Sequence, residues 1–412
     1  MEKVDPVGRA KEWMLEQYER GYSEADGEIC AACVSEPALR KWIEAKLTST
    51  QCTFCGSESE HAIAASFDDF VGVVRAGIAF DWNHPDDEGI MYISAEGGYQ
   101  APVSDSWQVF ADYDISENPD VIEALIDSIG NDGWVERGFY RGDDSQRLVW
   151  GWDWFKHVTK HQTRYLFLNP EADDRDDIPA SQMLDTIGEV IARDLGGLEI
   201  IKAIGQETDL FRIRVGDEPY DTAAAIGPPP AEYANQSNRM SPAGIPMFYG
   251  AFNIDTAKVE TLDPAAHVDQ TLSIGVFRSM RDLKVVDLAN LPGIPSVFDP
   301  DAHALIHPLR FLYAFAHDLV QPIARDGREH IEYVPTQIVT EFFRRGFRDS
   351  DDHPLDGLIY LSSRNGEPAC VLFCENDQCA DADYVGPLYN RLLRLTAVSH
   401  QVCPSTAGVA VK

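Results

Sequence analysis

Residues 238–260 read NRMSPAGIPMFYGAFNIDTAKVE and place one arginine, one tyrosine and one glutamate along a short strand–turn–helix pattern. Arg239 precedes a connection interrupted by proline and glycine, and Tyr249 lies in the apolar run that follows. A helix is predicted over 255–261, and it carries Glu260. A guanidinium can bind a diphosphate with two hydrogen bonds, a phenol can stack on a flat ring, and a carboxylate can stabilise a cationic sugar-centred transition state. The pattern predicts a site for a phosphorylated, ring-bearing substrate; a surface loop before an exposed helix is the alternative.

Three further segments follow in order downstream, at 333–337 (YVPTQ), 356–363 (DGLIYLSS) and 371–373 (VLF). Together with the spacing of Arg239, Tyr249 and Glu260, they resemble the RES family, named for its Arg, Glu and Ser. RES proteins are toxins with a fold like the ADP-ribosyltransferases, and they consume NAD by hydrolysis, by phosphorolysis or by transferring ADP-ribose to a protein. The resemblance covers the last half of the chain. It implies an α+β protein in which residues 180–412 form a mixed α/β RES domain.

The resemblance also implies roles for single residues. Arg239 would hold the diphosphate, Tyr249 would pack against nicotinamide and its ribose, and Glu260 would bond the ribose hydroxyls and stabilise the developing positive charge. Ser362 would fix the nicotinamide side, with Ser363 as the neighbouring alternative. Side chains alternate along a strand, so only one of the two serines can face the pocket.

A strand predicted over 208–215 carries Arg212 and Arg214. RES proteins often carry an arginine in this first strand, so either residue could help to bind the diphosphate. We expect Arg212 to be a paired surface charge and Arg214 to bind substrate. The loop at 219–237, rich in alanine and proline, is expected to be mobile and to cover the pocket.

The chain lacks a G-x-G-x-x-G motif after a strand, so NAD is expected as a substrate and not as a redox cofactor. Water, phosphate and a protein side chain remain open as acceptors. We favour water, and therefore a NAD glycohydrolase, over a NAD phosphorylase or a protein ADP-ribosyltransferase. A binding protein with a degenerate RES scaffold is the rival from a different class.

Two C-x-x-C pairs stand near the N-terminus, Cys30 with Cys33 and Cys52 with Cys55. Their spacing is typical of a structural zinc site with four thiolate ligands. We predict a zinc knuckle over about 28–58, with buried free thiols or a redox pair as the alternative. Four other cysteines form no such pairs and are expected to be free thiols; they are Cys370, Cys374, Cys379 and Cys403.

The N-terminal region resembles the helical HEPN-type domain found ahead of some RES domains, and we assign residues 1–175 to it. Helices are predicted at 8–21, 38–47, 66–80, 118–129 and 145–161, with the aromatic residues of the last helix in the core. Many HEPN proteins are ribonucleases with an Arg followed by a His on one helix. The predicted N-terminal domain has no such pair, and a ribonuclease acting through Arg310 and His317 is disfavoured by their position. An acidic link at 171–179 is the predicted domain boundary.

The chain of 412 residues has a formal net charge of −34, and 44% of its residues are hydrophobic. Such length and composition predict two or three globular domains. A chain this acidic repels nucleic acid and anionic lipid, so neither is an expected partner. The first residues are charged and no apolar run reaches membrane-spanning length, so we expect a cytoplasmic protein. Restraint of a NAD-consuming toxin could come from an antitoxin or regulatory protein, from the N-terminal domain, or from homo-oligomerisation.

Overall fold

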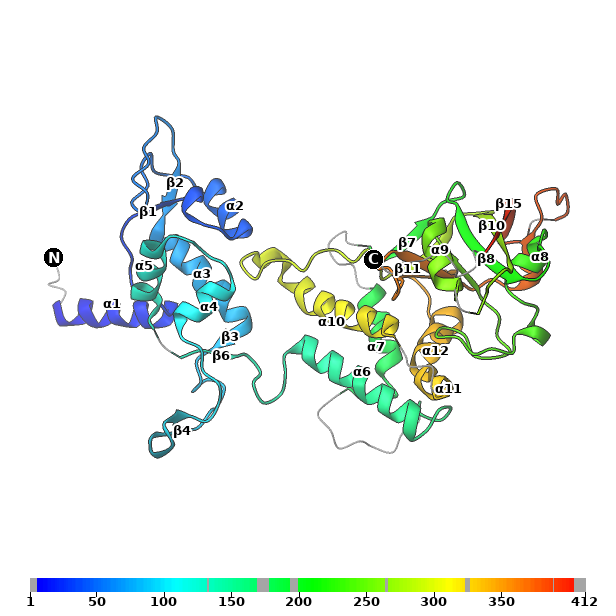
Figure 1. The fold of residues 1–412 in the computed structure, drawn as a ribbon. Helices are drawn as coiled ribbons and strands as arrows, with labels where there is room; N and C mark the ends of the chain where they lie inside the picture. The colour runs from blue at the N-terminus through cyan, green and yellow to red at the C-terminus, as the bar shows by residue number, and fades with distance from the viewer. Residues whose placement is uncertain are drawn as a thin grey trace. The chain divides into compact units, whose positions relative to one another are not determined.

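A computed structural model describes residues 6–131, 133–168, 178–192, 199–263, 266–322, 327–387 and 389–403. The chain forms two compact units (Figure 1): Met1–Ser145 with Ile294–His307, and Gln146–Gly293 with Pro308–Lys412. The first unit is mainly helical and the second is built on a mixed sheet, so the predicted α+β class is confirmed. Within the described ranges, every helix is too short or too polar to cross a bilayer.

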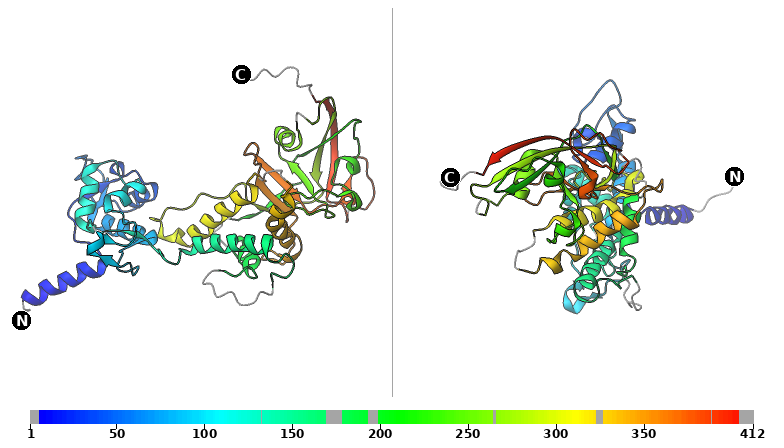
Figure 2. Two further views of the ribbon diagram at one scale, coloured as in Figure 1. Left: turned by 60° about the horizontal axis from the view of Figure 1, so that its bottom comes forward. Right: turned by 90° about the vertical axis from the view of Figure 1, so that its right-hand side faces the viewer.

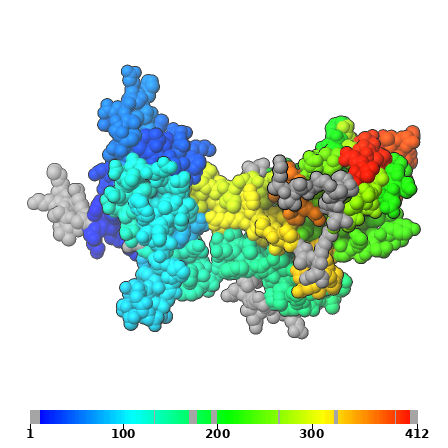
Figure 3. Space-filling view, in the orientation of Figure 1, coloured from blue at the N-terminus to red at the C-terminus, as the bar shows by residue number. Residues whose placement is uncertain are grey.

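The first unit contains five helices among its described residues: α1 (Pro6–Arg20), α2 (Pro37–Ala45), α3 (Phe67–Asp81), α4 (Ser106–Asp112) and α5 (Pro119–Ile129). Its short strands form three antiparallel pairs: β1 (Glu28–Cys30) with β2 (Ala64–Ser66), β3 (Trp82–Asn83) with β6 (Val135–Glu136), and β4 (Tyr92–Ile93) with β5 (Gly98–Tyr99). The exposed segment between α2 and β2 projects from the surface of this unit (Figure 3).

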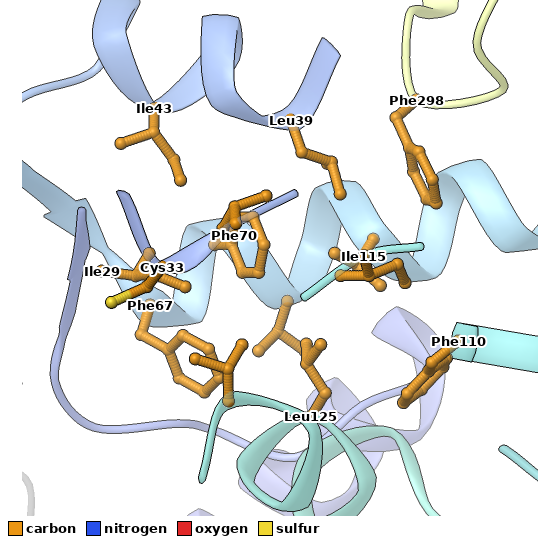
Figure 4. Packing of buried hydrophobic residues seen from close by; sticks show 14 of the residues in the cluster. Ile29, Cys33, Leu39, Ile43, Phe67, Phe70, Phe110, Ile115, Leu125 and Phe298 are labelled. Atoms are coloured by element: carbon orange, nitrogen blue, oxygen red, sulfur yellow. The ribbon is translucent and has the colours of Figure 1, made fainter. Parts of the chain in front are cut away.

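Helix caps in the first unit follow from the sequence. Ser66 accepts a hydrogen bond from the Asp69 amide at the start of α3, and Asn118 does the same for Asp120 at the start of α5. Both caps satisfy amides that a helix leaves unpaired. The apolar faces of α2, α3, α4 and α5 then pack into one core that includes Leu39 and Phe70 (Figure 4).

The second unit contains a nine-stranded mixed sheet in the order β14-β15-β10-β8-β9-β13-β12-β11-β7. The strands are β7 (Ile201–Ile204), β8 (Leu210–Gly216), β9 (Phe248–Ala251), β10 (Thr271–Ser279), β11 (Leu283–Asp287), β12 (Gly357–Leu361), β13 (Pro368–Leu372), β14 (Cys379–Ala380) and β15 (Leu393–Val402). Two neighbouring pairs are parallel, β11 with β12 and β14 with β15, and the others are antiparallel. Figure 2 shows how the sheet twists and curls.

The helices of the second unit are α6 (Asp144–His161), whose first two residues belong to the first unit, α7 (Met183–Ala192), α8 (Ala223–Ile226), α9 (Ile254–Thr261), α11 (Glu329–Glu332) and α12 (Val334–Glu341). A further helix, α10 (His303–Val320), begins in the first unit and ends in the second. The strand predicted over 208–215 and the helix predicted over 255–261 are present as β8 and α9. Helix α12 continues into a π-helical turn at Phe342–Gly346.

Most of the aromatic helix α6, which the sequence assigns to the N-terminal domain, makes its packing contacts within the second unit. Trp152 stacks edge-on against Phe315 of α10 with ring centroids 5.1 Å apart, and its indole nitrogen donates to Asp318 at 2.7 Å. Trp152 is 2% exposed, whereas Trp150 is 41% exposed, so the prediction that Trp150 is a core residue is wrong. The helix turns only one face inward, and residues two positions apart point to different sides.

The contacts between residues place the boundary of the two units between Ser145 and Gln146, because most of α6 packs on helices of the second unit. Most of the predicted link at 171–179 lies outside the described residues. Residues 294–307 return to the first unit, where the Phe298 ring packs over Gly77 of α3. Contacts between segments so far apart in the sequence cannot be predicted from local sequence patterns.

Candidate functional site

A cavity of about 960 Å³ lies in the second unit. Residues of β8, β9, α9 and the β12–β13 turn line it, together with the connection that leads into β9. Among the described residues, the charged side chains that line it are four arginines and one glutamate; they are Arg212, Arg214, Arg239, Arg364 and Glu260. The cavity is thus cationic in a chain of formal charge −34. Its size is at the upper end of the range for small-molecule sites.

Arg239 lies in a tight turn of the connection before β9. The turn is closed by the Asn238 amide, which donates to the Ser241 carbonyl at 2.8 Å. One guanidinium nitrogen of Arg239 donates to the Leu319 carbonyl at 2.9 Å, and its Cζ lies 5.9 Å from the centre of the Tyr333 ring. Burial lowers the pKa of Arg239, because enclosure disfavours the charged form, yet the guanidinium remains a cation at neutral pH.

Tyr249 lies in β9, and its hydroxyl forms a hydrogen bond of 2.9 Å with the Ser241 hydroxyl. Burial raises the pKa of Tyr249 to about 12, so the phenol is neutral at physiological pH. Tyr249 lines the cavity, as its place in the motif predicts. Its hydrogen bond to Ser241 also connects β9 to the turn that carries Arg239.

Glu260 projects from α9, a helix capped by Asn253, whose side chain accepts from the Thr256 amide at 2.8 Å. The Ser362 hydroxyl donates a hydrogen bond to the Glu260 carboxylate. Ser362 is 2% exposed and does not line the cavity, whereas the exposed Ser363 does. Of the two serines, Ser363 is therefore the one that lines the cavity, whereas Ser362 contacts Glu260.

Arg212 and Arg214 lie on the same face of β8 and both line the cavity. Arg212 donates to the backbone carbonyls of Ile226 at 2.9 Å and Tyr249 at 2.5 Å. Burial and the neighbouring Arg214 lower the pKa of Arg212 to about 9. The prediction that Arg212 is a paired surface charge is wrong, because alternation along β8 turns it inward.

The Arg214 guanidinium forms fewer hydrogen bonds than that of Arg212. Its Nη2 donates to the Gly227 carbonyl at 2.8 Å, but its buried Nε has no hydrogen-bond partner among the described residues. Within the described ranges neither Arg212 nor Arg214 forms an ion pair with a carboxylate. Two buried guanidinium groups without an anion are costly, and an anionic ligand would offset that cost.

Three residues that line the cavity were missed as site residues from the sequence: Tyr333, Tyr360 and Arg364. Tyr333 and Tyr360 lie inside motifs that had already been noted, but the motifs alone do not show which side chains point inward. Burial raises the pKa of Tyr360 well above its ordinary value, and the Glu260 carboxylate acts in the same direction. Both tyrosines supply aromatic surface beside the arginines.

A family model described as "RES domain" matches residues 209–393. The second unit contains a RES domain. The matched range includes every described residue that lines the cavity. A second family model, "HEPN/RES N-terminal domain 1", matches residues 45–173 and thus includes α6 in the N-terminal domain, although most of α6 packs in the second unit. Neither the curated proteins nor the solved structures contain a match to this chain.

Outside the RES domain, the four predicted ligands Cys30, Cys33, Cys52 and Cys55 come together. Their Sγ atoms lie 3.8 Å apart for Cys30–Cys33, 3.6 Å for Cys30–Cys55 and 3.8 Å for Cys33–Cys52. A tetrahedron of thiolates with Zn–S bonds of about 2.3 Å has edges of about 3.8 Å. The four thiols can therefore hold a metal ion with little rearrangement.

The other four cysteines are buried, and none forms a disulfide. Cys374 and Cys379 lie with their Sγ atoms 3.6 Å apart, but no group of three or more metal-ligating residues includes either of them among the described residues. That they are free thiols stays a prediction.

Proposed function

We propose that the RES domain cleaves the bond between nicotinamide and ribose in NAD⁺, with water as acceptor. The observation that carries the proposal is the cationic cavity, whose described lining has four arginines and one glutamate in a strongly acidic chain. Such a cavity suits a ligand with a diphosphate and a positively charged reacting centre. The RES family is associated with reactions of NAD, which agrees with this chemistry.

In the proposed complex, Arg214 and Arg239 bind the diphosphate. Each has donors left for a ligand: only one donor of each is used by a described protein acceptor. Tyr249 and Tyr360 provide aromatic surface for the nicotinamide and its ribose.

Glu260 acts at the reacting centre. As the C1–N bond of the nicotinamide ribose breaks, the electron pair leaves with neutral nicotinamide, and positive charge develops on the ribose. The Glu260 carboxylate stabilises that charge and bonds the ribose hydroxyls. Water then forms the new C1–O bond and loses one proton, which gives ADP-ribose, nicotinamide and H⁺.

Phosphorolysis is the second candidate, because the cavity carries more guanidinium groups than one diphosphate requires. Inorganic phosphate on Arg212 and Arg364 would then replace water as the acceptor. Transfer of ADP-ribose to a protein uses the same pocket and needs an additional docking surface. A ribonuclease active through Arg310 and His317 is not favoured, since neither residue lines the cavity.

We further propose that the four-cysteine cluster of the first unit holds one structural Zn²⁺ ion. Four thiolates fill a tetrahedral coordination sphere and leave no position for substrate. Cys30, Cys33 and Cys52 are buried beside the core of the first unit, so the metal would join β1, the following 3-10 turn and the projecting segment.

An enzyme of this kind depletes NAD⁺ in the cell that contains it, so the proposed role is that of a cytoplasmic toxin in a toxin–antitoxin or anti-phage system. An antitoxin, the N-terminal domain or self-association would restrain it.

The leaving group gives a direct test of the chemistry. The nicotinamide of NAD⁺ leaves as a neutral molecule, whereas the dihydronicotinamide of NADH does not carry the charge that drives its departure. We expect the purified chain to release nicotinamide from NAD⁺ and to leave NADH intact, as followed by chromatography. Equal loss of both dinucleotides would contradict cleavage at this bond and point to attack on the diphosphate.

A further inference from the structure

One face of α12 contacts the turn that carries Arg239. Thr336, Gln337 and Thr340 lie in α12, and Tyr333 directly precedes it. The four follow one another at intervals of three, one and three residues, which places them on the same side of the helix. Together they contact Ser237, Asn238, Arg239 and Met240, which are consecutive in the chain. We call this set of four side chains the α12 cradle.

Two of the contacts are hydrogen bonds to the backbone of the turn. The Thr336 hydroxyl donates to the Arg239 carbonyl at 2.5 Å, and the Gln337 amide donates to the Asn238 carbonyl at 2.7 Å. The Gln337 amide also donates to the Ser237 hydroxyl at 2.8 Å. These bonds fix the main chain directly beside the Cα of Arg239.

The other two contacts act on side chains. The Thr340 hydroxyl lies 3.4 Å from the Met240 sulfur, and the Tyr333 ring lies under the Arg239 guanidinium. Met240 is buried, so the residue after Arg239 is anchored on this helix as well.

The turn depends on these bonds because it lies outside the sheet. Residues 234–247 form no strand or α-helix, and the sheet begins again only at Phe248. Ser241 is held from the other side by Tyr249. Small displacements of a group that binds substrate cost much activity, so the placement of the guanidinium requires a rigid support.

We propose that Thr336 and Gln337 are positioning residues that act through Arg239. The effect on catalysis rests on the proposed function, whereas the effect on the turn itself does not. Without the cradle, the turn would sample other conformations, and Arg239 would bind the diphosphate less often. Because this contact is made in substrate and transition state alike, its loss should raise KM and leave kcat nearly unchanged.

The test compares four variants of the full chain. Thr336→Val and Gln337→Met remove the donors, and Thr336→Ser keeps the hydroxyl. Thr159→Val is the matched control, because Thr159 is a buried threonine on α6. Among the described residues, its hydroxyl bonds only to carbonyls of its own helix, those of Phe155 and Lys156. Amide hydrogen exchange of peptides covering 234–247 is measured first, and NAD⁺ turnover second.

Loss of a buried hydrogen-bond donor should speed exchange of the 234–247 peptides by about tenfold in Thr336→Val and in Gln337→Met. The KM for NAD⁺ should rise by about the same factor, with kcat within about twofold of the wild type. Thr336→Ser should restore both values, and Thr159→Val should change neither.

Wild-type exchange of the 234–247 peptides in both donor-removal variants would overturn the proposal. So would faster exchange with an unchanged KM in an active enzyme. If Thr336→Val does not fold, Gln337→Met decides, because Gln337 is only half-buried. If the wild type consumes no NAD⁺, the proposed function fails, and hydrogen exchange still decides whether the cradle holds the turn.

Discussion

The hydroxyl of Ser362 donates a hydrogen bond to the carboxylate of Glu260, and so links the end of β12 to helix α9. A second bond supports this link, from the Asn365 amide to the Thr256 hydroxyl at 3.0 Å. Ser362 is buried and does not line the cavity, while Ser363 does. Ser362 therefore contacts the carboxylate, whereas the neighbouring Ser363 lines the cavity.

Ser362→Ala should leave the fold intact and reduce kcat for NAD⁺ by about tenfold or more, because a hydrogen bond to a charged group contributes about 1.5–3 kcal/mol. Ser363→Ala should change KM more than kcat. Steady-state kinetics on the two variants measure this difference. Equal effects of the two substitutions on kcat would contradict the separate roles.

Glu260→Gln should abolish most turnover, since one preorganised charge interaction contributes about 3 kcal/mol or more to the barrier. The residue is exposed, so folding should be unaffected. Nicotinamide release and the melting temperature check both parts. A Glu260→Gln protein that releases nicotinamide at the wild-type rate would exclude the carboxylate from the reaction.

Arg214→Met should weaken NAD⁺ binding by about tenfold or more, through loss of a charge-assisted hydrogen bond. Without ligand, the variant should be at least as stable as the wild type, because burial lowers the pKa of Arg214 and the charged form is therefore disfavoured in the folded protein.

Arg278→Met is the control for this variant, since Arg278 pairs with Asp209 and Glu207. Binding measured by calorimetry and thermal melting without NAD⁺ separate the two effects. A marked loss of stability in Arg214→Met alone would indicate a structural role.

Much of this site was predictable from the sequence, because each residue lies in a short motif with its own local structure. Arg239, Tyr249 and Glu260 line one cavity, as the order of turn, strand and helix predicts. The inward direction of Arg212 was not predicted, although alternation along β8 allows it. Which serine meets the cavity depends on the β12–β13 turn, and no pattern in the sequence determines it.

The organisation of the chain was less predictable. Helix α6 follows the N-terminal domain in sequence but packs on α10, about 160 residues later, through Trp152 and Phe315. The aromatic residues of α6 predict that part of the helix is buried, but they do not predict that it packs against α10. Four cysteines in two C-x-x-C pairs were sufficient to predict a cluster, because metal ligands leave a strict spacing.

Purified protein should contain about one zinc ion per chain, as measured by mass spectrometry of the metal. Cys52→Ser should remove the metal and lower the melting temperature of the first unit, because metal binding supplies folding free energy to small units. Cys403→Ser is the control, as it alters a buried thiol outside the cluster. Protein prepared without chelator that contains no zinc, or a Cys52→Ser variant that retains it, would disprove the zinc site.

The central claim is that the RES domain cleaves NAD⁺ with water as acceptor. The most direct measurement is to incubate the purified chain with NAD⁺, with and without inorganic phosphate, and to identify the products by mass spectrometry. We predict free ADP-ribose and nicotinamide under both conditions, with none formed by Glu260→Gln. Unchanged NAD⁺ in the presence of folded protein would contradict the claim. Formation of ADP-ribose-1″-phosphate when phosphate is present would show that phosphate, and not water, is the acceptor.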